Sequence, residues 1–266
     1  MKRKVDVPLN IKILIAAHKK YWMPDDDVYL PIHVGAAGKA DLGYTRDDTG
    51  DNISEKNPNF CELTALYWAW KNLDADYVGL VHYRRYFSHT QWAMTTEAKR
   101  RNILRGDDFQ RLLQDVPIIV PGKRNYVIET TQSQYEHAHY AGDLKAVKEL
   151  LHQQCPQYDP AFELVMQRTW GHRFNMFVMR RDYYDAYCFW LFSLLFELEK
   201  QLNISQYDTY QARVYGFLAE RLLDVWLETN HVPYVEQKVS FLEKQNWLKK
   251  GGKFIQRKLC HRKVGK

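Results

Sequence analysis

Short apolar runs alternate with longer segments of helical periodicity along this chain, and that alternation constrains its fold more than any other feature. The runs are candidate strands at 11–17, 77–81, 116–120 and 174–179. Helices are expected from about residue 57, at 130–153, at 183–202 and at 208–229, where apolar side chains recur every three or four positions. Strands that alternate with helices are typical of a mostly parallel sheet covered by helices. The sequence therefore predicts an α/β fold whose last part is helical.

Three local patterns refine this expectation. Residues 24–60 are rich in Asp, Gly, Asn and Pro and are predicted to be irregular, which in a compact domain indicates a functional or disordered stretch. Near the start of the first helix, Asn59 and Glu62 have the spacing of a capping box. Asp74-Ala75-Asp76 precedes the second strand and is interpreted as a turn.

The second strand ends in His82-Tyr83-Arg84-Arg85. In open α/β sheets, ligands bind beyond the carboxyl ends of the strands. Arg84 and Arg85 are suited to grip a diphosphate there, because a guanidinium group matches phosphate oxygens with two parallel hydrogen bonds. Surface arginines joined to Asp or Glu are the alternative, but the exit of a buried strand favours the binding role.

Composition and targeting signals indicate a soluble protein made and kept inside the cell. Of the 266 residues, 45% are hydrophobic and 26% charged, which excludes a disordered or fibrous chain. The four cysteines form no close pair, so neither a zinc site nor a disulfide framework is expected. No signal-peptide core follows the basic N-terminus, and the most apolar run, 189–196, is far shorter than the ~20 residues of a spanning helix.

Familiar nucleotide-binding and hydrolase motifs are missing from the sequence. It contains no G-x-G-x-x-G, no P-loop, no H-E-x-x-H and no G-x-S-x-G. Their absence argues against dinucleotide oxidoreductases, NTPases, zincins and α/β-hydrolases.

Three motifs do carry a likeness: DDTGDNIS at 47–54, NFCELT at 59–64 and VHYRRYF at 81–87. Together they resemble a bacterial family of capsular and exopolysaccharide glycosyltransferases, long catalogued as a domain of unknown function, and the likeness runs from about Ile11 to Phe241. The resemblance implies a GT-A-like α/β fold, with a mostly parallel (mixed) sheet flanked by helices and a helical C-terminal part. It also implies a hexosyltransferase that moves a hexosyl unit, such as galactose or galactofuranose, from a UDP-sugar to a lipid-linked oligosaccharide in capsule, exopolysaccharide or O-antigen synthesis.

The resemblance also bears on metal use. GT-A enzymes usually hold a divalent metal with Asp-x-Asp at the end of a buried strand, whereas this chain has His82-Tyr83-Arg84 at that position. Arginine cannot ligate Mg²⁺ or Mn²⁺, which prefer oxygen, but it can neutralise a departing diphosphate directly. We therefore expect no cofactor and no metal-binding residues. His82 as a metal ligand is the alternative, without an evident carboxylate partner.

Several residues are assigned to the donor nucleotide-sugar by the same resemblance. His18 and Lys19 end the first strand, at the edge that lies near the base and phosphates in the resembling fold. Asp51 and Asn52 belong to a long acidic segment beside this basic site, and they are expected to hold ribose or sugar hydroxyls or to contact Lys or Arg of the phosphate site. His82, Arg84 and Arg85 complete the donor set. A solvated basic turn at His18 and plain turn chemistry at 47–52 are the structural alternatives.

Transfer with inversion also needs a general base for the acceptor hydroxyl. Glu220 in the late helix looks like the acidic residue that fills this role in many GT-A enzymes, with Asp208 in reserve. Arg213 and Glu220 share one helix face, opposite the apolar stripe, and that face is either cleft or solvent. His139, Asn175 and Arg213 are assigned to the acceptor, although simple packing of His139 is the alternative.

Residues 244–266 form a basic tail that carries nine Lys or Arg and no acid. The expected organisation is a single GT-A-like domain at 1–243 followed by this tail. With Trp247, Phe254 and Ile255, the tail is suited to lie on an anionic membrane surface, so the protein is expected to be cytoplasmic and peripheral at the inner face of the plasma membrane. The alternative function is a non-catalytic, basic nucleic-acid-binding module, for which no recognised motif is present.

Overall fold

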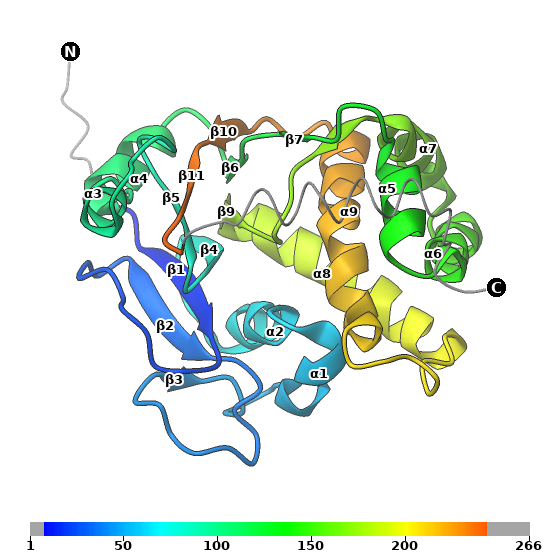
Figure 1. The fold of residues 1–266 in the computed structure, drawn as a ribbon, viewed down its shortest axis with the longest axis horizontal. Helices are drawn as coiled ribbons and strands as arrows, with labels where there is room; N and C mark the ends of the chain where they lie inside the picture. Colours follow the sequence, from blue (N-terminus) through cyan, green and yellow to red (C-terminus); the bar gives the residue numbers. More distant parts are fainter. Residues whose placement is uncertain (1–7, 244–266) are drawn as a thin grey trace.

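The computed structural model describes residues 8–243, and a mixed sheet lies at their centre (Figure 1). The strands are β1 (Ile11–Ala17), β2 (Tyr29–His33), β3 (Thr45–Arg46), β4 (Tyr77–His82), β5 (Arg85–Phe87), β6 (Ile118–Pro121), β7 (Arg124–Asn125), β8 (Trp170–Gly171), β9 (Phe177–Arg180), β10 (Val235–Gln237) and β11 (Val239–Phe241). The α-helices are α1 (Asn57–Phe60), α2 (Leu63–Asn72), α3 (Thr96–Arg101), α4 (Gly106–Leu112), α5 (Thr131–Ala138), α6 (Ala141–Gln154), α7 (Asp159–Gln167), α8 (Arg181–Gln201) and α9 (Val214–Thr229). Short 3-10 turns are η1 (Ser54–Lys56), η2 (Pro156–Tyr158) and η3 (Gln211–Arg213).

The order of the strands creates a point where the chain changes direction across the sheet. The central order is β10-β6-β9-β4-β1-β2-β3, with β5 joining β4 to β11. From β1 the chain first builds β2 and β3 on one side, and then returns through α1 and α2 to β4 on the other side. β1 is parallel to both β2 and β4, so the carboxyl ends of these three strands lie at one edge. Such a switch point is where open α/β sheets leave a crevice for ligands.

Helices cover both faces of the sheet, which explains why β1 is apolar and buried from Ile13 to Ala17. Leu14 and Ala16 pack with side chains of α2, α8 and α9 in one core cluster. Ile13 and Ile15 point to the opposite face and pack with Phe109 of α4 in a second cluster. The expected fold, a mixed and largely parallel sheet between helices, is confirmed. Within residues 8–243, no helix combines the length and apolar character needed to cross a membrane.

Three element boundaries differ from the expectations. The strand expected at 174–179 begins at Phe177, because Phe174 and Asn175 adopt positive φ angles of 79° and 51°, which no strand contains. The helix expected at 130–153 is two helices, because His139 is extended and ends α5. The helix expected at 208–229 begins at Val214 after the η3 turn.

Two expectations for residues 24–62 are wrong. The stretch 24–60 was expected to be irregular, but it contains β2, which pairs with β1 although Pro31 interrupts its pattern. The capping box of Asn59 and Glu62 does not form. Asn59 lies inside α1, and Glu62 is the residue before α2.

Candidate active site

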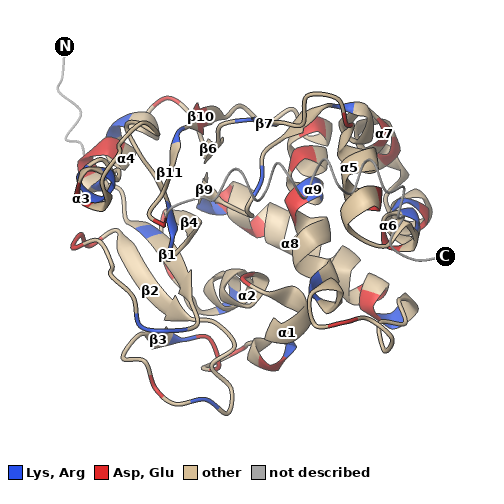
Figure 2. Ribbon diagram, in the orientation of Figure 1, with Lys and Arg blue, Asp and Glu red and all other residues tan. Residues whose placement is uncertain are grey.

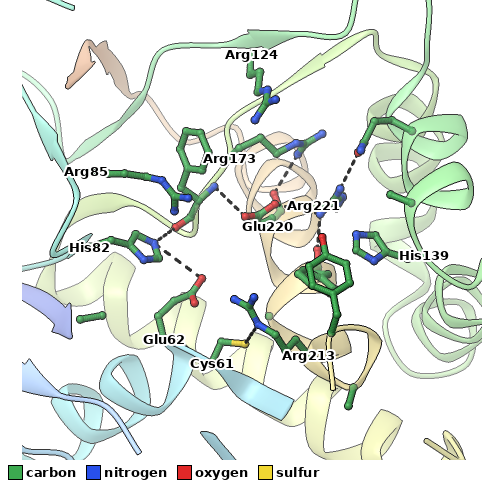
Figure 3. Close-up of a pocket in the computed structure, with 18 of the residues that line it drawn as sticks. Cys61, Glu62, His82, Arg85, Arg124, His139, Arg173, Arg213, Glu220 and Arg221 are labelled. Carbon is green, nitrogen blue, oxygen red and sulfur yellow. Dashed lines mark hydrogen bonds and ion pairs between the residues drawn. The ribbon is translucent and has the colours of Figure 1, made fainter. Parts of the chain in front are cut away.

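A cleft of about 1490 Å³ opens at the carboxyl ends of β1, β2 and β4, where the topology predicts a crevice. Ala16 and His18 of the β1 end, Val34 of the β2 end and the segment 82–85 line one side. The α1–α2 junction, the β7–α5 segment and the first turns of α9 close the other sides (Figure 3). The volume exceeds the ~300–1,000 Å³ of an ordinary small-molecule pocket, so it leaves room for two substrates.

The charge of the cleft lining is strongly positive. Six arginines line it against three glutamates: Arg84, Arg85, Arg124, Arg173, Arg213 and Arg221, with Glu62, Glu129 and Glu220. Elsewhere the charges are mixed, and Figure 2 shows basic and acidic positions interspersed on α4 and α6. A concave site lined by one sign of charge attracts ligands of the opposite sign.

Arg85 is the arginine most available to such a ligand. Its guanidinium carbon lies 4.6 Å from the Phe174 ring and 5.8 Å from the Phe241 ring, and no hydrogen bond or ion pair engages it within residues 8–243. Burial lowers the pKa of this guanidinium, against the opposing influence of Glu220 and Glu62. Its neighbour Arg84 instead donates to Oε2 of Glu243 at 2.9 Å.

Two of the other arginines are structural. Arg173 is 3% exposed and donates to the carbonyl groups of His172 and Glu220. Arg221 is 4% exposed and donates to Gln134 at 2.8 Å as well as to Glu220. Both therefore hold the walls of the cleft together.

Arg124 and Arg213 are exposed and face the cleft (Figure 3). Arg213 donates to Sγ of Cys61 at 3.1 Å, and burial raises the pKa of that thiol to about 12. Cys61 is therefore a neutral acceptor, not a thiolate that neutralises the arginine. Both guanidinium charges remain available to a ligand.

A two-residue kink at Phe174 and Asn175 connects the titratable groups of the site. His82 donates from Nε2 to the Phe174 carbonyl oxygen at 2.6 Å, and the Phe174 N–H donates to Oε1 of Glu220 at 3.2 Å. Asn175 donates from Nδ2 to Oε1 of Glu62 at 2.7 Å. Positive φ angles at two successive non-glycine residues are costly and persist only where surrounding contacts impose them. Here those contacts come from the site itself.

The two central carboxylates differ in how many contacts they already make. Glu220 accepts hydrogen bonds on both oxygens, from the Phe174 N–H and from Arg221 at 3.1 Å. Glu62 accepts on Oε1 alone, and His82 Nε2 lies 3.9 Å from that oxygen. Burial lowers the pKa of His82, so the neutral imidazole is favoured next to Glu62. Oε2 of Glu62 has no partner within the described chain, and Figure 3 shows this side chain pointing into the cleft from the opposite side to Glu220.

The structure brings most of the sequence-predicted site residues to this cleft. The residues that line it are His18, His82, Arg84, Arg85, His139, Arg213 and Glu220. Arg213 at the end of η3 and Glu220 on α9 therefore both face the cleft rather than open solvent. His139 is buried, and its Nδ1 lies 3.0 Å from Oε1 of Gln211.

Four predicted donor or acceptor residues do not line the cleft. Lys19 lies over the rings of Tyr21 and Tyr83. Asp51 accepts from Tyr67, and Asn52 donates to the backbone of Gly50, so both belong to turn structure. Asn175 is 3% exposed and donates to two groups at the cleft wall, Oε1 of Glu62 and the Gly216 carbonyl oxygen.

Asp47 and Asp208 of the predicted acidic segments also serve the fold. Asp47 is fully buried and accepts from the Gly35 and Ala36 N–H groups. Asp208 accepts from the N–H groups of Tyr210 and Gln211 and does not line the cleft.

Glu62 and Arg124 are among the cleft residues that sequence reasoning missed. Glu62 was assigned to a helix cap, and the irregular geometry of Cys61, with φ of 54°, turns its side chain toward the cleft instead. The sequence contained one indication that Glu62 belongs to the site, because Glu62 lies within the NFCELT motif at 59–64. Arg124 lies in a two-residue strand that no periodicity marks.

No cluster of three or more His, Cys, Asp or Glu with metal-binding geometry occurs in residues 8–243. Asp76 lies at the amino end of β4, away from the cleft, where its carboxylate accepts from the Asn10 N–H at 2.8 Å. Asp74-Ala75-Asp76 therefore belongs to the connection that leads into β4, which has a bend at Asp76.

Comparisons with known proteins agree with this geometry. A family model described as a domain of unknown function (DUF4422) matches residues 12–231. Among solved structures, the chain is similar to the apo structure of WbbM, a bifunctional glycosyltransferase, with 32% sequence identity and a TM-score of 0.82. That similarity covers 88% of this chain and 46% of the other, so this chain spans about half the length of that protein. No curated protein matches the chain.

Proposed function

The chain belongs to the DUF4422 family, and we propose that it is a glycosyltransferase that moves a hexosyl unit from a UDP-sugar to a glycan acceptor. The observation that carries the proposal is the arginine-lined cleft at the carboxyl ends of β1, β2 and β4, in a fold shared with a glycosyltransferase. In the proposed reaction an acceptor hydroxyl oxygen bonds to the anomeric carbon, and the bond from that carbon to the diphosphate breaks. UDP leaves with the electron pair.

Arg85 is proposed to stabilise the departing diphosphate, with Arg124 of β7 as its partner. Within residues 8–243 no carboxylate forms an ion pair with Arg85, so a diphosphate would not have to displace a protein anion to bind it. The nucleoside is proposed to lie against the β1 and β2 ends, beside His18 and Val34. Arg84 borders the same site but is shared with Glu243.

The proton of the acceptor hydroxyl needs a carboxylate if transfer inverts the anomeric centre. The sequence assigns this role to Glu220. The hydrogen bonds on both of its oxygens favour a positioning role instead, in which Glu220 fixes Phe174. We therefore propose Glu62 as the proton acceptor, because Oε2 is available and the side chain reaches the middle of the cleft (Figure 3).

Transfer without a divalent metal remains part of the proposal. Arginines supply the positive charge that an Asp-x-Asp-bound metal supplies in other GT-A enzymes. The expected result is that transfer persists in excess EDTA. Loss of transfer with chelator, restored by Mn²⁺ or Mg²⁺, would contradict it.

A ligand screen by thermal unfolding tests the function directly. A ligand that binds only the folded state raises Tm by mass action, so UDP and UDP-sugars should raise it and an oligonucleotide should not. Release of UDP from a panel of UDP-hexoses then identifies the donor. The reverse ligand preference would favour the alternative of a nucleic-acid-binding module.

A lipid-linked oligosaccharide acceptor, and a role in capsule, exopolysaccharide or O-antigen synthesis, belong to the same proposal.

A further inference from the structure

The end of the cleft farthest from His82 and Arg85 is aromatic. Tyr207, Tyr210 and Phe217 line it together with His139, which Figure 3 shows on the opposite side of the cleft from His82. Tyr210 is 52% exposed although it packs against the other rings. An aromatic ring left half in water at the wall of a cleft is a surface on which a ligand can stack.

This surface is assembled before any ligand arrives. The Tyr210 ring lies 5.2 Å from the Phe217 ring and 6.0 Å from the His139 ring, and Phe217 lies 4.1 Å from His139. Gln211 holds the other side of this stack, since it donates to the Ala138 carbonyl at 3.0 Å and contacts His139. Because the rings support one another, binding would order few side chains and would lose little conformational entropy.

Hydrogen-bonding groups surround the rings. Thr209, Gln134 and the Glu129–His137 pair line the same end of the cleft, and Arg213 lies over the Phe217 ring at 5.4 Å. A flat apolar face bordered by hydroxyl, amide and charged groups matches a pyranose ring. Such a sugar presents C–H groups on one face and hydroxyls around its edge.

We propose that Tyr210 and Phe217 form the acceptor subsite and that it binds a pyranose ring of the glycan by stacking. This inference rests on the proposed function, because it assigns the diphosphate to Arg85 at the other end of the cleft. In the set of acceptor residues, Tyr210 and Phe217 take the place of Asn175, which is buried. Arg213 stays in the set beside them.

Saturation-transfer difference NMR with UDP and a mixture of methyl hexopyranosides tests the subsite. The wild-type protein should give signals from sugar ring protons and from uracil and ribose protons. Tyr210→Ala should lose the sugar signals and keep the UDP signals, while Tyr210→Phe should keep both because it retains the stacking ring. Phe189→Ala is the matched control, because Phe189 is 66% exposed on α8 and does not line the cleft.

Each outcome separates the subsite from the proposed function. If wild-type protein gives UDP signals but no sugar signals, or if Tyr210→Ala keeps the sugar signals, the subsite is wrong and the glycosyltransferase proposal stands. If Tyr210→Ala loses the UDP signals instead, the rings hold the nucleobase and the subsite is again wrong. If the wild-type protein gives no UDP signal, the proposed function itself fails. Unchanged Tm values for the variants exclude unfolding as the cause of a loss.

Discussion

The arginines of the cleft differ in what already holds their guanidinium groups, and that difference separates ligand-binding from structural roles. Arg173 and Arg221 are buried among carbonyl and carboxylate acceptors, so removing either leaves buried partners without hydrogen bonds. Arg84 forms an ion pair with Glu243, whereas the interactions of Arg85 in the described part of the chain are with the rings of Phe174 and Phe241. The adjacent pair in the sequence is therefore not a symmetric clamp.

We expect Arg85→Ala to lower kcat/KM for the UDP-sugar by about 10²–10³, the loss typical of removing one preorganised charge donor in a water-excluded site. Arg84→Ala is the matched control and should lose much less, because its ion pair with Glu243 is 43% and 40% exposed and such pairs contribute ~0–1 kcal/mol. Steady-state kinetics at saturating acceptor measure both. Equal losses, or a larger loss for Arg84→Ala, would contradict the assignment.

The two carboxylates give a second comparison at the scale of single residues. Glu62→Gln removes the proposed proton acceptor and should lower kcat by about 10²–10⁴, the range of general base catalysis, with little change in the KM for the donor. Glu220→Gln keeps an acceptor for the Phe174 N–H and should retain more activity. The pH dependence of kcat checks the role. Protonation of a general base lowers kcat at acidic pH, so this acidic limb of the pH profile should disappear when the base is replaced. Retention of that limb in Glu62→Gln would return the role to Glu220.

Among the elements, the segment between β8 and β9 shows where sequence patterns fail. Its apolar character predicts a strand from residue 174, and only tertiary contacts reveal that Phe174 and Asn175 turn away from the ladder. The break between α5 and α6 is similar, since no proline or glycine marks the extended His139. Long apolar runs such as β1 were predictable, because a strand that helices cover on both faces carries apolar side chains at successive positions. Kinks that depend on contacts between residues 46 to 113 positions apart in the sequence were not.

The burial of His82 beside this kink should make stability depend on pH. Burial holds the pKa of His82 below its usual 6.5 in the folded protein, so the unfolded chain binds more protons between the two values. The free energy of unfolding should therefore fall as pH decreases below about 6.5. In His82→Gln, urea unfolding between pH 7.5 and 5.5 should show a shallower pH slope than wild type. His18 and His33 also have lowered pKa values and supply the remaining slope. An unchanged slope in His82→Gln would exclude His82 as a contributor.

At the scale of the whole molecule, the sequence predicted the class of the sheet and the edge where the cleft opens. Both depend on the alternation of strands and helices and on one strand that ends in basic residues. The composition of the cleft was less accessible, because it is assembled from the α1–α2 junction, β7 and α9, which lie far apart in the sequence. Glu62 and Arg124 meet Arg85 only after folding. Sequence reasoning therefore finds the wall at the strand ends and the residues Arg213 and Glu220, but it misses the contributions of the α1–α2 junction and of β7.

The basic segment 244–266 lies outside the described residues, and its proposed role is to dock the molecule on an anionic membrane surface. Its nine Lys or Arg residues are worth ~1 kcal/mol each when they reach such a surface, so a few suffice for reversible binding.

Truncation after Glu243 should leave transfer to a soluble acceptor intact, because the cleft residues and the Arg84–Glu243 pair all precede the cut. Co-sedimentation with vesicles containing phosphatidylserine should weaken markedly in the truncated protein. Binding of the full chain should fall as salt screens the charges and should be weak on uncharged vesicles, which serve as the control. Equal co-sedimentation of the truncated and full-length proteins would place the membrane contact elsewhere on the molecule.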